Sequence, residues 1–429
     1  MLEFCDVPYR FFPARYSPTV SWLAKQINRT LILPGQNHRL QEIELAGEID
    51  KVQSLYEKGK RLLFVANHPS HSDPQLMFEV QRRLGVPSAF MAAYDIFLRG
   101  SIQAWVMQKT GAFSIDREGN DRKAMAEAIN ILKSGGLALT IFPEGNVYLM
   151  NDRVTPLLDG TSFIAVKAHQ ALKGNGEVVV IPLSFKFSQM DDIRPQIWER
   201  LEQLAKDCGY EGELDQGAPQ KAVLAVGGYM LSHFLGEKTA IKEADIDFTV
   251  TSPVEIQDQL FDLSRRLVAD LESELEMETD EEVFIVDRVR KVRSRIHQLR
   301  LSTESNDEET RDDLAPLADR AILVFRLLAY VLPYLNEHPT LDRYAETVER
   351  LCEDFYSKSF KPLGPRKALV RIGEPIEVGS VLAQVGGKSR DAVPELTAAM
   401  EKRITTGIDV LNESNETPGS KLLDDLSRG

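Results

Sequence analysis

The chain has 429 residues, of which 43% are hydrophobic and 27% are charged, so it is long enough to bury one sizeable core and a second unit. The formal net charge of −14 argues against a general nucleic-acid binder, whose surface is usually basic. The cysteines Cys5, Cys208 and Cys352 are too few and too scattered for a disulfide or zinc framework. We therefore expect a large cytoplasmic protein that binds no nucleic acid.

Residues 1–50 are predicted to form a helical segment. Val20, Leu23, Ile27 and Leu31 recur at helical spacing, with basic residues and Trp22 beside them. Such a helix either docks on the rest of its domain or faces a membrane. An acidic residue stands near the start of the sequence, where a secretory signal carries positive charge, and this predicts no such signal.

The apolar run 61–66 predicts a strand that delivers His68, and Asp73 follows five residues later. Of the seven histidines, His68 alone has an aspartate at this spacing. An imidazole whose tautomer is fixed by a carboxylate can act as a general base. The alternative is that Ser72 or Asp73 caps a helix that runs to Leu84, which does not exclude catalysis.

Arg117 follows the next strand-like segment. Its guanidinium could bind a phosphate monoester through two parallel hydrogen bonds. The alternative is an ion pair with Asp116, Glu118 or Asp121.

Glu144 and Gly145 end a further apolar run, in the sequence Phe-Pro-Glu-Gly. At the carboxyl end of an open sheet, a carboxylate here could accept hydrogen bonds from a polyol or steer the catalytic ring. The alternative is a carboxylate at the start of a helix, where it would satisfy free backbone amides.

Four blocks in order resemble the glycerolipid acyltransferase superfamily: the Asn-His pair with its aspartate, Gly-Ala-Phe-Ser-Ile-Asp-Arg, Phe-Pro-Glu-Gly and Val-Ile-Pro. The resemblance covers residues from about 60 to 187 and a late strand near 368–376. In that family the His-Asp pair does the chemistry, and the arginine and the Glu-Gly pair serve the acceptor. These roles transfer to His68, Asp73, Arg117, Glu144 and Gly145.

The resemblance implies transfer of a fatty acyl chain from acyl-CoA or acyl-carrier protein to a hydroxyl of 1-acyl-glycerol-3-phosphate or a related lysophospholipid, in phospholipid biosynthesis. No metal or other cofactor is expected. Many members that use phosphorylated acceptors continue the third block with Thr-Arg, whereas this chain has Asn146 and Val147. Arg153 is the candidate substitute, or else a surface residue. A non-phosphate lipid or polyol acceptor and a non-catalytic lipid-binding module remain the alternatives.

The pattern predicts an α/β fold in which a mixed sheet is flanked by helices. The resemblance of residues 368–376 to a late strand of the family implies that a large, mainly helical insertion precedes the last strand. The catalytic domain is expected at 51–187 plus 365–385, the insertion at 188–364 and a polar tail that frays at 386–429. Acid-rich residues 302–313 are expected to form a loop within the insertion.

A basic run lies on one predicted helix of this insertion. Its default interpretation is a solvated face with acidic partners, and the alternative is a docking patch for anionic lipid or acyl-carrier protein. The run consists of Arg288, Arg290, Lys291, Arg293 and Arg295.

No uninterrupted apolar run reaches the roughly 18 residues that a membrane span needs. The nearest, 321–335, is broken by Arg326 and Pro333. A lipid-handling enzyme of this sequence is therefore expected to be peripheral, at the inner face of the membrane.

Overall fold

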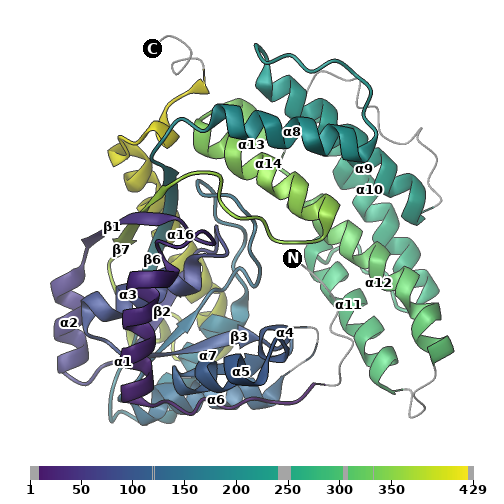
Figure 1. Cartoon of the computed structure of the whole chain (residues 1–429). Coiled ribbons are helices and arrows are strands. Elements are labelled where there is room, and N and C mark those ends of the chain that lie inside the picture. The colour runs from purple at the N-terminus through teal and green to yellow at the C-terminus, as the bar shows by residue number, and fades with distance from the viewer. Residues whose placement is uncertain are drawn as a thin grey trace. The chain divides into compact units, whose positions relative to one another are not determined.

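The computed structural model describes residues 9–117, 119, 121–239, 253–302, 308–331 and 333–423. These residues form two compact units (Figure 1). The first, here called the α/β unit, contains Tyr9–Asp192 and Lys361–Lys421. The second, here called the helical unit, contains Ile193–Phe360 and residues 422–423.

A mixed sheet of eight strands lies at the centre of the α/β unit in the described chain, which confirms the predicted fold class. The strand order is β1-β7-β6-β2-β5-β3-β4, and β8 pairs with β6. Strands β2 to β6 are mutually parallel, whereas β7 is antiparallel to β6 and β1 is parallel to β7. The strands are β1 (Leu40–Gly47), β2 (Arg61–Ala66), β3 (Ser88–Ala93), β4 (Ala112–Ile115), β5 (Ala138–Ile141), β6 (Val178–Gln189), β7 (Arg366–Ile372) and β8 (Ile376–Glu377).

The reversed direction of β7 and β1 brings distant segments to the edge of the sheet at which β2 ends. β2 pairs with β6 as far as Ala66 opposite Leu183, and β6 continues to Gln189. Arg366 begins β7 opposite Gln189, and it also pairs with Leu40, which begins β1. The carboxyl end of β2 and the amino ends of β7 and β1 therefore lie toward the same edge.

Helices lie against both faces of this sheet. They are α1 (Pro18–Ile27), the π-helix η1 (Asn28–Ile32), α2 (Ile49–Glu57), α3 (Asp73–Leu84), α4 (Tyr94–Leu98), α5 (Ser101–Lys109), α6 (Arg122–Ser134), α7 (Asp159–Ala171), α15 (Val378–Gln384), α16 (Ser389–Ser414) and the 3-10 helix η3 (Pro418–Ser420).

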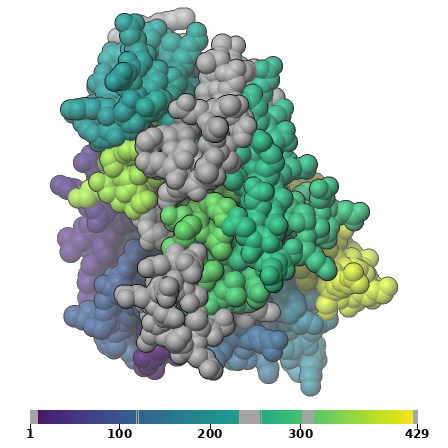
Figure 2. All heavy atoms as spheres, turned by 90° about the vertical axis from the view of Figure 1, so that its right-hand side faces the viewer, coloured from purple at the N-terminus to yellow at the C-terminus, as the bar shows by residue number. Residues whose placement is uncertain are grey.

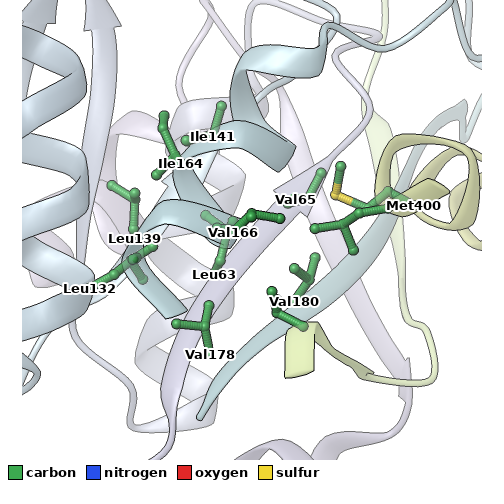
Figure 3. Close-up of a cluster of buried hydrophobic side chains, with 14 of the residues drawn as sticks. Leu63, Val65, Leu132, Leu139, Ile141, Ile164, Val166, Val178, Val180 and Met400 are labelled. Carbon is green, nitrogen blue, oxygen red and sulfur yellow. The ribbon is translucent and has the colours of Figure 1, made fainter. Parts of the chain in front are cut away.

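Alternate side chains of the central strands fill two cores, one on each face of the sheet. β2 is an uninterrupted apolar run, as expected for a strand that is buried on both faces. Leu63 and Val65 join the core that α6, α7 and α16 complete (Figure 3). Leu62 and Phe64 join the core that α2 and α3 complete. The end of β2 is consequently packed on both faces, immediately before the loop that carries His68.

The helical unit supplies the helical region that was predicted before the last strands. Helices α10, α11 and α12 pack against one another and contribute to the green surface seen in Figure 2. The helices are α8 (Arg194–Cys208), α9 (Pro219–Thr239), α10 (Pro253–Glu274), α11 (Ile285–Ser302), α12 (Glu308–Ala329), α13 (Pro333–Glu337) and α14 (Leu341–Tyr356).

Three local predictions are wrong. Leu40–Gly47 within the expected amino-terminal helical segment is strand β1, whose half-exposed pattern gives little apolar signal. The expected fraying tail contains α16, which buries Leu396, Met400 and Ile404 in the core. α12 begins at Glu308, inside the expected acidic loop, while residues 303–307 and 424–429 lie outside the described chain.

The basic run on α11 is only partly the predicted solvated face: Lys291 and Arg295 are exposed and Arg290 pairs with Asp287, whereas two other members are buried. Arg288 is buried, and its guanidinium donates to both carboxylate oxygens of Glu272 at 2.9 and 2.7 Å. Arg293 is also buried, with its guanidinium carbon 5.5 Å from the ring centroid of Phe325. Two of the five basic residues are therefore enclosed by neighbouring helices and cannot contact a docking partner.

Candidate active site

Asn67 extends the sheet by one residue beyond the end of β2. Its side-chain amide donates to the carbonyl oxygen of Phe185 at 2.9 Å, and its side-chain oxygen accepts from the Phe185 backbone N–H at 2.7 Å. The fully buried side chain thus imitates a backbone partner for β6. The direction in which His68 leaves the strand is fixed by this pairing.

The structure brings His68 and Asp73 together. The Nδ1 atom of His68 lies 2.6 Å from Oδ2 of Asp73. The ring of His68 stacks on Phe142, with ring centroids 4.4 Å apart and planes 21° from parallel. Because an ionised carboxylate can only accept, Nδ1 carries the proton and Nε2 is the nitrogen that can accept one. The side chain of His68 is 16% exposed, so its ring reaches solvent while Asp73 does not.

Asp73 is completely buried, and burial raises the pKa of its carboxyl group. Its Oδ2 atom also accepts from the backbone N–H of Ser70 at 2.9 Å. Within the described residues, Oδ1 of Asp73 has no hydrogen-bond partner. Ser72 stands at the N-cap position of α3, yet its side chain makes no capping hydrogen bond. The simple capping interpretation of Ser72 and Asp73 therefore does not describe their side chains.

Glu144 joins His68 to a second loop. The carboxylate accepts from the backbone N–H of His68 at 2.7 Å, from the backbone N–H of Thr155 at 3.1 Å and from the Thr155 hydroxyl. Burial raises the pKa of Glu144. No helix begins there, since α7 starts at Asp159, so the helix-start alternative is wrong. Both oxygens of Glu144 are engaged by protein donors, which suits a role in holding the position of His68.

Gly145 is required by the turn after Glu144. Its φ angle is +74°, in the left-handed region, and a Cβ atom there would lie 2.9 Å from Cδ1 of Leu158. A larger residue would displace the turn that carries Glu144.

Arg117 and Arg153 lie apart from this network. Arg117 is exposed after β4 and pairs with Asp95 at 3.3 Å, a partner that its sequence neighbourhood does not suggest. Asp121 instead caps α6, and Glu118 lies outside the described residues. Arg153 is exposed between β5 and α7. Among the described residues, no hydrogen bond or ion pair joins either arginine to His68 or Asp73.

Several residues of the site have no signal in the sequence. Thr155 stands eleven residues after Glu144, in a segment without regular structure. His38 and Arg366 reach the loop that follows β2 from far along the chain, and both do so because β1 and β7 run against the other strands. Asn67 is adjacent to His68, but its pairing with Phe185 depends on the position of β6.

A His-Asp pair at the carboxyl end of a central strand is an arrangement that can act as a general base. Residues 47–186 match the family model described as Acyltransferase. This part of the chain is an acyltransferase domain of the glycerolipid acyltransferase family, which confirms the resemblance, and it supports a lipid acyltransferase activity in general. No curated protein matches the chain.

Proposed function

We propose that the protein moves a fatty acyl chain from the thioester of acyl-CoA or acyl-carrier protein to a hydroxyl of a glycerolipid. The proposed acceptor is 1-acyl-glycerol-3-phosphate or a related lysophospholipid, in phospholipid biosynthesis. The 2.6 Å contact between His68 Nδ1 and Asp73 Oδ2 carries this proposal, because it leaves Nε2 to serve as a base. No metal or other cofactor takes part in the proposed reaction.

The reaction needs one base and no covalent enzyme intermediate. Nε2 of His68 removes the acceptor's hydroxyl proton as the hydroxyl oxygen attacks the thioester carbon. The carbon–sulfur bond breaks, an ester forms, and the imidazolium returns the proton to the departing thiolate. Asp73 holds the tautomer and stabilises the imidazolium, as carboxylates do in comparable triads.

Arg117 is the proposed binding group for an acceptor phosphate. Its pairing with Asp95 is long, at 3.3 Å, and both side chains are partly exposed, so the pair is worth about 1 kcal/mol or less. A phosphate could therefore displace Asp95. Arg117→Ala should raise the KM of the acceptor much more than that of the acyl donor. Arg153→Ala should do the same if Arg153 substitutes for the missing arginine, and should leave both KM values unchanged if it is a surface residue. A change confined to the donor's KM would refute the phosphate role.

A direct assay decides between catalysis and the alternatives. The purified full-length protein is given acyl-CoA or acyl-carrier protein with glycerol phosphate, lysophospholipids, neutral monoacylglycerol and amino-lipids, and products are identified by mass. We expect acylation of a phosphate-bearing lysolipid together with release of free thiol. Acylation of neutral acceptors alone would favour the non-phosphate alternative, while lipid binding without product would favour a non-catalytic module.

We further propose that the α/β unit binds the cytoplasmic face of the membrane peripherally. Among the helices of the described chain, none has the length and hydrophobicity to cross a bilayer. Large apolar side chains are nevertheless exposed on helices that pack together, including Trp22 at 63% and Ile102 at 79%. We call this set the apolar face. It consists of Trp22, Leu23, Ile27, Leu31, Ile32, Leu98, Ile102 and Trp105.

The chemistry of the apolar face suits a lipid surface. Tryptophan is favoured at the boundary between headgroups and acyl chains. Arg29 is exposed beside it, and burial lowers the pKa of Lys25 to about 8, so both side chains are mainly cationic at neutral pH. Each basic residue contributes about 1 kcal/mol near an anionic membrane, so apolar insertion must supply most of the affinity.

Vesicle flotation tests this membrane proposal. The double variants Trp22→Glu/Leu23→Glu and Ile102→Glu/Trp105→Glu should each float less well with anionic vesicles than the wild type. Phe284→Glu is the control, because Phe284 is 83% exposed but belongs to the helical unit. Equal flotation of all four proteins would show that the apolar face does not bind lipid.

A further inference from the structure

Arg366 is a buried arginine at the first position of β7. In the register of the sheet it lies opposite Gln189, six residues along β6 from the partner of Ala66. This places Arg366 beside the loop that follows β2, although Arg366 is far from that loop in the sequence. Its guanidinium also lies over the ring of Phe187, with 5.0 Å between the guanidinium carbon and the ring centroid.

The guanidinium of Arg366 binds the loop between the two members of the His68–Asp73 pair. Nη2 donates to the Ser72 hydroxyl at 2.8 Å, and Nη1 makes a longer contact of 3.4 Å with the Ser70 hydroxyl. Nη2 and Nε also donate to the carbonyl oxygen of His38, at 2.8 and 3.2 Å. One rigid fork thus ties the loop to the segment that precedes β1.

Ser70 passes this constraint to Asp73. The Ser70 hydroxyl accepts from the backbone N–H of Ser72 at 3.2 Å. The backbone N–H of Ser70 donates to Oδ2 of Asp73 at 2.9 Å, and Oδ2 is the atom that faces Nδ1 of His68. A displacement of Ser70 or Ser72 would therefore move the oxygen that orients the imidazole.

His38 determines the direction of the Ser72 hydroxyl proton. Its Nδ1 atom lies 2.9 Å from the Ser72 hydroxyl oxygen. Burial, together with the nearby charges of Arg366 and His71, lowers the pKa of His38 to about 4, so its ring is neutral at neutral pH. Because a guanidinium can only donate, Ser72 accepts from Arg366 and donates its own proton to His38. The Ser72 hydroxyl thereby both accepts and donates a hydrogen bond, and it does not cap α3.

We propose that Arg366 is a positioning residue for the His68–Asp73 pair, a role that rests on the acyl transfer proposed above. It touches neither the imidazole nor the reacting atoms, and acts through Ser70 and Ser72. The planar guanidinium is essential, because the single ammonium group of lysine cannot donate to Ser70, Ser72 and His38 from one position. Misplacement of a catalytic group by about 1 Å typically costs on the order of a hundredfold in rate.

The test compares Arg366→Lys and Ser72→Ala with the wild type. Both variants should lower kcat by about tenfold or more, while the KM of donor and acceptor stays within about twofold, because binding groups are untouched. The second readout is the Nδ1 proton of His68, whose short hydrogen bond gives a far-downfield proton resonance that is identified by its loss in His68→Ala. Both variants should shift or broaden this resonance.

Arg371→Lys is the matched control, since Arg371 lies on the same strand but on its opposite face, beside α16. It should keep the kcat and the resonance of the wild type. If Arg366→Lys does not fold, Ser72→Ala carries the test, because it removes a single hydroxyl. Wild-type kcat and an unchanged resonance in the folded variants would overturn the proposal. If the wild type acylates no acceptor, the proposed function fails, and the resonance alone still decides whether Arg366 positions the pair.

Discussion

Arg366 of the α/β unit and Arg288 of the helical unit are both buried, yet they bind different kinds of acceptor. Arg288 donates to both oxygens of Glu272, a neighbour on the adjacent helix. Arg366 donates to the hydroxyl oxygen of Ser72, in the loop after β2, and to the carbonyl oxygen of His38, in the segment before β1. A buried arginine paired with a carboxylate joins two helices, whereas one that binds neutral oxygens orders a polar loop. We therefore expect Arg288 to contribute to stability and Arg366 to contribute to the order of the site.

The largest effect is expected at Asp73. Asp73→Asn should lower kcat by about a hundredfold to ten-thousandfold, because the amide can no longer fix the His68 tautomer. The loss of stability should be small, since burial raises the pKa of Asp73 and the neutral side chain avoids the cost of a buried charge. Steady-state kinetics and thermal unfolding measure the two quantities.

Asp342→Asn is the control for that experiment, because Asp342 is also buried but lies in the helical unit. It should leave kcat unchanged. An equal loss of kcat in Asp73→Asn and Asp342→Asn would show that the effect is not specific to the site in the α/β unit.

Loss of the ion pair between Arg288 and Glu272 should lower stability and leave kcat unchanged. Arg288→Met should lower the free energy of unfolding by about 3–5 kcal/mol, because Glu272 is left buried and unpaired. Arg288→Met/Glu272→Met should recover most of that loss, and the folded fraction of each variant should keep the wild-type kcat. Denaturant unfolding checks the first statement. A double variant as unstable as the single one would show that the pair does more than neutralise charge.

Glu144→Gln tests whether Glu144 serves the acceptor or His68. An amide cannot accept all three hydrogen bonds from His68 and Thr155, so kcat should fall by about ten- to a hundredfold. The KM of the acceptor should change little. A large rise in acceptor KM with a normal kcat would instead support the acceptor-binding role that the sequence suggests.

His38 should give the smallest effect, a change in how stability depends on pH. Its pKa of about 4 in the folded protein is below the ordinary value of 6.5, so folding favours the neutral ring. The stabilisation is complete above pH 6.5 and is lost as the pH falls from 6.5 to 4. His38→Gln should flatten this part of the curve, while exposed His338→Gln should not. Identical curves for wild type and His38→Gln in denaturant unfolding would contradict the assignment.

The parts of the molecule that the sequence predicts are those with a strong local signal. β2 has the predicted bounds and α3 ends at the predicted Leu84, because an uninterrupted apolar run and an amphipathic helix are determined by their local sequence. The proximity of His68 and Asp73 also follows from a short spacing. The strand β1 and the buried side of α16 could not be predicted, since their burial depends on neighbours far along the chain.

The contacts of the charged groups in the site could not be predicted from the sequence for the same reason. Arg117, after β4, pairs with Asp95 of α4, and Glu144 accepts from Thr155 and from the backbone N–H of His68. The burial of Arg288 and Arg293 could not be predicted, because a periodic charge pattern does not reveal which part of a helix its neighbours will cover.

The most direct test of the central claim is the rate of acyl transfer by His68→Ala. With acyl-CoA and the lysophospholipid identified by the product assay, we expect the rate to fall by a factor of about a hundred to ten thousand. Thermal unfolding should remain close to that of the wild type, because the ring is partly exposed and its removal leaves Asn67 and β2 in place. Full acyl-transfer activity in a folded His68→Ala protein would contradict the account.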